Sequence, residues 1–118
     1  MEGVAFSLCD TLTLFAELGI PVERIRLGGG GARGPLWRQI QADVYGRAVE
    51  LLAAEEGGAF GAALLAGVGV EAWPSVEAAC AATVQVAQSI EPANAATMEE
   101  AYARFRRVYP ALKEIGRT

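Results

Sequence analysis

Histidine is absent from this sequence of 118 residues, and cysteine occurs only twice, at Cys9 and Cys80. Without histidine the chain cannot itself supply a Ser-His-Asp or Cys-His catalytic centre, a histidine-bound metal or a histidine pH switch. The two cysteines stand far apart and have no companion ligands, so too few ligands are present for a zinc site. The sequence also contains no run of 18 apolar residues, so no membrane-spanning segment is predicted.

Positive charge is also scarce. Ten Lys and Arg residues face fourteen Asp and Glu residues, which gives a net charge of −4. An acidic chain repels phosphate backbones, so no nucleic-acid partner is predicted. The first residues have no basic leader, and Glu2 and Asp10 lie where a signal peptide is uncharged, so a cytoplasmic protein is expected. The composition, 53% hydrophobic and 20% charged, indicates one small globular domain.

Apolar spacing and helix end signals predict an alternation of helices and short strands. Helices are predicted at residues 2–18, from Pro35 to Gly46, at 58–67, at 76–82 with Ser75 as its cap, and at 94–115. Strands are predicted at residues 24–28 and 48–52, and residues 84–90 are expected to be extended. The predicted fold class is therefore α/β, rich in helices, with too few strands for a complete sheet.

The same spacing predicts which side chains are buried. The first helix is expected to bury Val4, Leu8, Leu12 and Phe15, and the second is expected to bury Leu36, Ile40 and Val44 with Trp37 at the flank. The last helix is amphipathic through Met98, Tyr102, Phe105, Val108 and Leu112, and a basic surface is expected from Arg104, Arg106, Arg107, Lys113 and Arg117. A first helix that begins at Glu2 without a capping residue indicates a segment of a longer protein.

The most informative motif is the run of four glycines, Gly28 to Gly31, between a predicted strand and the helix at Pro35. Glycines let the backbone approach a ligand closely, and a helix N-terminus offers free N–H groups and a positive dipole end. The turn therefore predicts an anion or nucleotide site, with a turn that binds nothing as the alternative.

Two nucleotide motifs can be compared with this turn. Gly29 and Gly34 have the spacing of a Walker A loop, but Pro35 stands where the lysine is required, so a P-loop is excluded. Gly29, Gly31 and Gly34 also fit GxGxxG, and Glu50 lies where a ribose-binding acid belongs. A dinucleotide-binding half-domain of Rossmann type, or a non-catalytic nucleotide-binding module, therefore stays open.

Several ordered blocks resemble the FGGY carbohydrate kinases, and within them the branch that phosphorylates D-xylulose. Residues 29–43 are similar to the nucleotide-loop segment of that family, residues 2–8 to the helix before it, and residues 56–66 to the helix after it. Residues 101–112 look like the final helix of the family. The likeness covers nearly the whole chain.

The resemblance implies a partial ribonuclease H-like, actin-like ATPase domain, with residues 1–118 as the C-terminal part of the second, nucleotide-binding domain. It implies ATP and Mg²⁺ as cofactors of the full-length kinase, which transfers a phosphoryl group to a sugar bound mainly by the missing domain. No catalytic or metal-binding residue is expected in this chain, which should be inactive alone. The residues expected to bind nucleotide are Gly29, Gly30, Gly31, Ala32, Gly34 and Gly61.

Other polar and aromatic residues have a functional and a purely structural interpretation. Asp43 could be a ligand, but an acid near a helix end is commonly solvated or locally bonded. Arg33 could contact phosphate, and Trp37 could stack on a base or form the rim of the core. The adjacent Glu55 and Glu56 are interpreted as an exposed turn. An apolar face left open where another domain should dock would favour a homo-oligomer.

Overall fold

The computed structural model describes residues 1–54 and 57–116 of the chain. Its elements are, in order, α1 (Glu2–Glu17), β1 (Ile25–Leu27), a 3-10 turn η1 (Gly30–Arg33), α2 (Pro35–Tyr45), β2 (Val49–Leu52), α3 (Gly57–Gly69), α4 (Val76–Thr83), β3 (Val86–Ile90), α5 (Ala95–Phe105) and α6 (Val108–Ile115). This order confirms the predicted helix-rich α/β class. The predicted turn at Glu55–Glu56 and the basic residue Arg117 lie outside the described residues.

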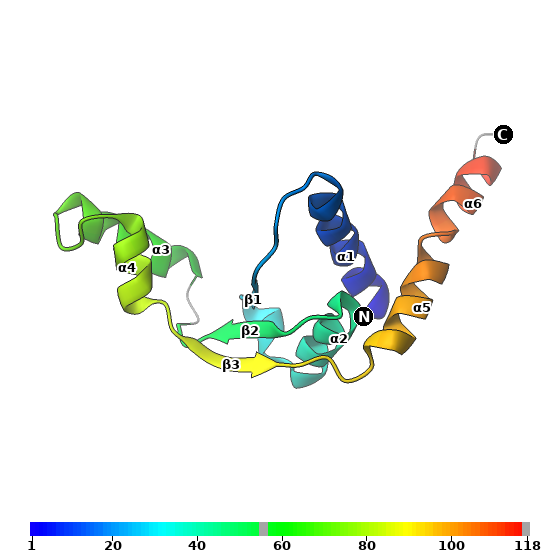
Figure 1. The fold of residues 1–118 in the computed structure, drawn as a ribbon, viewed down its shortest axis with the longest axis horizontal. Coiled ribbons are helices and arrows are strands. Elements are labelled where there is room, and N and C mark those ends of the chain that lie inside the picture. Colours follow the sequence, from blue (N-terminus) through cyan, green and yellow to red (C-terminus); the bar gives the residue numbers. More distant parts are fainter. Residues whose placement is uncertain (55–56, 117–118) are drawn as a thin grey trace.

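The three strands form one mixed sheet in the order β1-β2-β3. β1 and β2 run parallel, with Ile25 opposite Val49, because α2 returns the chain to the same end of the sheet. β3 pairs antiparallel with β2, with Val49 opposite Ile90. Figure 1 shows α3 and α4 at one end of the sheet and α1, α2 and α5 gathered at the other. The chain is elongated, with extents of 59 × 33 × 26 Å.

The main core lies between α1, α2 and α5. Its buried residues are Ala5, Phe6, Cys9 and Val44. The ring of Phe6 packs against Tyr102 and Phe105, with ring centroids 5.8 and 5.4 Å apart. Aromatic pairs at these separations stabilise a core beyond the area that they bury. The core therefore fixes α2, which follows the glycine-rich turn, against two other helices.

The predicted buried face of α1 is wrong. Val4 and Leu8 are 60% and 44% exposed, whereas Ala5, Phe6 and Cys9 on the neighbouring face are buried. Apolar residues occur around most of this helix, so their spacing alone did not select one face. The buried face is the one that carries Phe6, which packs against Tyr102 and Phe105 of α5.

The predicted bounds of α2 are confirmed, but one of its buried positions is not. Pro35 is the first residue of the helix, and Gly46 ends it with a φ of +60°, a conformation that favours glycine. Val44 is buried as predicted, whereas Leu36 is 65% exposed. Leu36 lies in the first turn of α2, and it is Trp37 that packs against the core there. The prediction for Leu36 was therefore wrong.

The single last helix predicted for residues 94–115 is also wrong, because the structure has two helices, α5 and α6. Pro110 explains the break. In a continuous helix it would lack the N–H that bonds to the carbonyl of Arg106, and its ring would clash with that carbonyl. Pro110 is tolerated within the first turn of α6, whose projection beyond α5 is visible in Figure 1. Val108 and Leu112 remain more than half exposed.

Candidate functional site

The glycine-rich turn joins the end of β1 to the start of α2. Gly29 has φ +77° and ψ 177°, a conformation nearly restricted to glycine. The turn is closed by two backbone hydrogen bonds, in which the Ala32 N–H donates to the Gly29 carbonyl at 3.1 Å and the Gly34 N–H to the Gly31 carbonyl at 3.2 Å. The run of glycines is therefore folded into a defined 3-10 turn.

A cavity of about 490 Å³ lies against this turn. Its floor is at the carboxyl ends of the parallel strands β1 and β2, and it is lined by Leu27, Gly28, Gly29, Gly30, Ala32, Arg33, Arg38, Leu51, Leu52, Ala53, Ala54, Gly57, Ala87 and Gln88. In open α/β sheets, ligands bind outside the carboxyl ends of the strands. The small residues leave the backbone accessible, and two arginines make the described lining positive.

One side chain connects the turn to the rest of the site. The Nε of Arg38 donates to the carbonyl oxygen of Ala32 in η1, and its Nη1 lies 3.4 Å from Oε1 of Gln88 on β3. Arg38 is half-buried and lines the cavity. Neither Arg38 nor Gln88 was predicted from the sequence. Arg38 lies one turn into α2, and helical side chains point back toward the N-terminus, so its spacing from Ala32 carried a usable signal.

The predicted nucleotide-binding residues fall into three groups. Gly29, Gly30 and Ala32 line the cavity. Gly31 and Gly34 lie on the other side of the turn, where they border a shallower hollow beside Trp37. A Cβ added to Gly31 would lie 3.5 Å from Nε1 of Trp37, so the indole packs against the turn.

Gly61, the sixth predicted residue, does not line this cavity, although Gly57 at the start of the same helix does. A Cβ added to Gly61 would meet nothing within 4 Å. Arg33 does line the cavity. Trp37 packs against the core, which agrees with its interpretation as the core rim.

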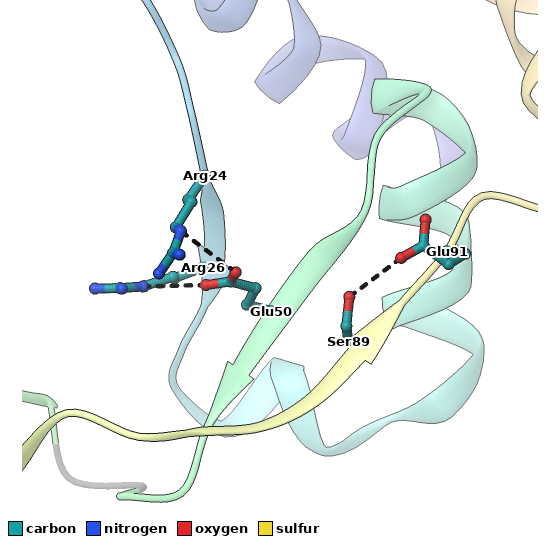
Figure 2. Close-up of polar contacts among 5 residues, drawn as sticks. All are labelled: Arg24, Arg26, Glu50, Ser89 and Glu91. Carbon is teal, nitrogen blue, oxygen red and sulfur yellow. Dashed lines mark hydrogen bonds and ion pairs between the residues drawn. The ribbon is translucent and has the colours of Figure 1, made fainter.

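Glu50 has a different environment from the one that a dinucleotide site requires. Figure 2 shows its carboxylate between two arginines of the neighbouring strand segment. Nε of Arg26 lies 3.3 Å from Oε2 of Glu50, and Nε of Arg24 lies 3.8 Å from Oε1. Arg26 and Ser89 are the register partners of Glu50 on the two flanking strands. Glu50 does not line the cavity, so its position does not favour a ribose-binding role.

Asp43 is buried, with 4% of its surface exposed. Its Oδ1 accepts the backbone N–H groups of Ala93 at 2.6 Å and Asn94 at 3.0 Å, and the side-chain amide of Gln39 at 3.0 Å. Burial acts to raise the pKa of Asp43, but these hydrogen bonds outweigh it and hold the pKa below its ordinary value. Asp43 therefore ties the start of α5 to α2.

Within residues 1–54 and 57–116, no group of three or more His, Cys, Asp or Glu residues is arranged to hold a metal ion. In the same part of the chain, the helices are too short or too polar to cross a bilayer.

The chain is similar to known proteins in sequence. Residues 1–70 match the family described as "FGGY family of carbohydrate kinases, C-terminal domain". The xylulose kinase of Staphylococcus epidermidis is 32% identical over 112 residues, which are 95% of this chain and 22% of that protein. The autoinducer-2 kinase of Salmonella typhimurium is 41% identical over 70 residues, which are 59% of this chain and 13% of that protein.

A solved structure shows the same fold. The xylulose kinase of Rhodospirillum rubrum superposes with a TM-score of 0.83 at 28% identity, over 99% of this chain and 24% of that one. This confirms the predicted fold class, a partial ribonuclease H-like, actin-like ATPase domain. The chain spans about a quarter or less of the length of each of these three relatives.

Proposed function

The chain belongs to the FGGY family of carbohydrate kinases, and from this premise we propose that residues 1–118 form the C-terminal part of the second, nucleotide-binding domain of a sugar kinase. The observation that carries the proposal is the glycine-rich turn with its cavity at the carboxyl ends of β1 and β2. A backbone without side chains, next to a helix N-terminus and two arginines, suits a phosphate-bearing ligand.

In this proposal the cavity holds the adenosine side of ATP. Gly29, Gly30 and Ala32 contact the nucleotide directly, since they line the cavity. Gly31 and Gly34 act through the shape of the turn, because they face Trp37 on its other side. Gly61 contributes by close approach of α3 when the nucleotide is bound.

The proposed reaction is transfer of the γ-phosphoryl group of ATP to a hydroxyl group of D-xylulose. D-xylulose is chosen because relatives that are 32% identical over 95% or more of this chain are named xylulose kinases. Enzymatic phosphoryl transfer depends on positioning and on stabilisation of charge. The described residues that line the cavity include no carboxylate that could take the proton of the sugar hydroxyl. We assign the base and the sugar contacts to residues beyond this chain, because the chain spans only 22% of the xylulose kinase that it matches.

Mg²⁺ is proposed to arrive with the nucleotide. It usually keeps several waters and binds through phosphate oxygens with one or two carboxylates. The described residues offer no carboxylate cluster for it, so no step is assigned to a metal on this chain.

Ligand preference tests the proposal. ATP and ADP should bind the protein more tightly than NAD, measured by equilibrium dialysis, whereas a Rossmann-type half-domain should prefer NAD. The 118 residues alone should show no xylulose-dependent ADP formation above background, whereas the longer protein that contains them should show it. A preference for NAD, or turnover by the 118 residues alone, would contradict the proposal.

We further propose that the protein is cytoplasmic, where ATP is available, and that it forms a homo-oligomer. Large apolar side chains on α1 and α6 are exposed, among them Val4, Leu14, Leu112 and Ile115. Such surface favours association in water. Light scattering should find a dimer or larger assembly at high concentration, and a monomer at every concentration would overturn this part.

A further inference from the structure

Arg38 connects three elements that border the cavity. It belongs to α2, it donates from Nε to the Ala32 carbonyl in η1, and its Nη1 lies within 3.4 Å of Gln88 Oε1 on β3. Only a planar guanidinium presents several N–H donors in a fixed fork that can reach two acceptors in this way. The side chain therefore joins the glycine-rich turn to both its own helix and the last strand of the sheet.

The turn needs such a contact because of its composition. Glycine loses more backbone freedom on folding than any other residue, and four glycines stand in a row here. Cβ atoms added at Gly28, Gly29 or Gly30 would meet no atom of the described residues within 4 Å, so a side chain at these positions would gain no packing contact. The two backbone hydrogen bonds of the turn are local and do not fix its position relative to the sheet.

The hydrogen bond from Arg38 also engages the carbonyl oxygen of Ala32, which is then not turned toward a ligand in the cavity. A carbonyl oxygen turned toward a phosphate-bearing ligand would repel it, because both carry negative charge. Donation from a guanidinium engages this oxygen and places a positive group beside it. Arg38 thus favours the conformation of the turn in which the described cavity lining remains receptive to an anion.

We propose that Arg38 is a positioning residue that holds the glycine-rich turn in its nucleotide-binding conformation. This inference rests on the proposed function for its ligand, an adenine nucleotide. The role of Arg38 is to hold the turn, and contact with the phosphates is not required. It follows that Arg38 acts on the turn before any nucleotide is present.

Hydrogen exchange of the free protein tests this role without a ligand. Mass spectrometry should follow the peptide that covers residues 28–35, whose Ala32 and Gly34 amides are protected within the turn. Arg38→Met should speed exchange there about tenfold, because a charge-assisted hydrogen bond is lost. Arg38→Lys should give an intermediate rate, since an ammonium group can still donate to the Ala32 carbonyl. Arg104→Met, which removes the same charge from the exposed surface of α5, should leave exchange unchanged.

Nucleotide binding separates positioning from direct contact. Arg38→Met should weaken the binding of AMP, ADP and ATP by the same factor, because all three nucleotides require the same ordering of the turn. If Arg38 instead contacts phosphate, the loss of binding affinity should grow from AMP to ATP, and this result would overturn the positioning role. Unchanged exchange in Arg38→Met would overturn it as well. If the wild-type protein binds none of the three nucleotides, the proposed function fails, and the exchange comparison still decides the role of Arg38 in the turn.

Discussion

The carboxylate of Asp43, near the end of α2, accepts the backbone N–H of Asn94 at 3.0 Å, although 51 residues separate the two in the sequence. The same oxygen accepts the Ala93 N–H, and both donors lie just before α5 begins. The N-terminal N–H groups of a helix have no partner within the helix. Asp43 therefore fixes the position at which α5 joins the core.

Replacing Asp43 should destabilise the protein. Asp43→Ala leaves the two backbone N–H groups without their acceptor, and a loss of about 2 kcal/mol in the free energy of unfolding is expected. Glu99→Ala, on the exposed surface of α5, is the matched control and should change this free energy little. Urea denaturation measures both variants. Equal midpoints for the two would contradict the role of Asp43.

The stabilisation by Asp43 should depend on pH in one direction. Because the folded protein holds the pKa of Asp43 below its ordinary value, the contribution is present above the pKa of the unfolded chain. It is lost as the pH falls through the lower pKa of the folded state. The difference in Tm between the wild type and Asp43→Asn, measured at intervals of about one pH unit, should therefore narrow as the pH falls from about 7 toward about 3. A constant difference across this range would contradict the assignment.

Gly29 and Gly30 should differ sharply in their tolerance of a methyl group. Gly29→Ala forces an L side chain into the positive-φ conformation and should cost about 1–3 kcal/mol of stability. Gly30→Ala is the matched control, because Gly30 has no positive φ and its Cβ would point into open space. Chemical denaturation should show a large loss for the first variant and a small change for the second. Equal losses would contradict the described geometry of the turn.

Tyr102 should ionise late in an alkaline titration. Burial and the hydrogen bond that its hydroxyl donates to Asp10 at 2.5 Å raise the pKa of Tyr102 to about 12. The neutral form therefore stabilises the folded state, and this contribution is lost as the pH rises from the ordinary tyrosine range through about 12. Burial also raises the pKa of Tyr45, so Tyr45→Phe is the matched control. Ultraviolet absorbance should show a tyrosinate step at a pH of about 12 that disappears in Tyr102→Phe and persists in Tyr45→Phe. A step at this pH that is unchanged in Tyr102→Phe would refute the assignment.

Much of the fold could be predicted from local signals. Pro35, Gly46 and Ser75 mark helix ends correctly, because the preference of each depends on a few neighbouring residues. Ser75, for example, accepts the Ala78 N–H at 3.2 Å, as a capping residue should. Which face of α1 is buried depends instead on distant partners such as Tyr102, and the apolar spacing of α1 did not contain that information.

The site shows the same division. The glycine-rich turn could be found because strand, glycines and helix are adjacent in the sequence. The contact between Arg38 and Gln88 could not, because β3 returns to the sheet only after two further helices. Asp43 was interpreted as solvated or locally bonded, but it is buried, and of its donors Gln39 is local. The Ala93 and Asn94 donors follow from the same return of the chain. Contacts between residues that are near in the sequence could be predicted, whereas contacts between residues that the topology brings together could be seen only in the structure.

The cavity beside the glycine-rich turn is proposed to hold an adenine nucleotide. The most direct test is the dissociation constant of ADP, measured by calorimetry, for the wild type, Gly30→Ala and Gly69→Ala. Gly30 lines the cavity, whereas Gly69 ends α3 and lies outside its lining, and neither has a positive φ. A methyl group at Gly30, which lines the cavity, should weaken ADP binding about tenfold or more, because the close approach of the backbone is lost. Gly69→Ala should bind as the wild type does. ADP binding that is absent from the wild type, or equal in all three proteins, would contradict the account.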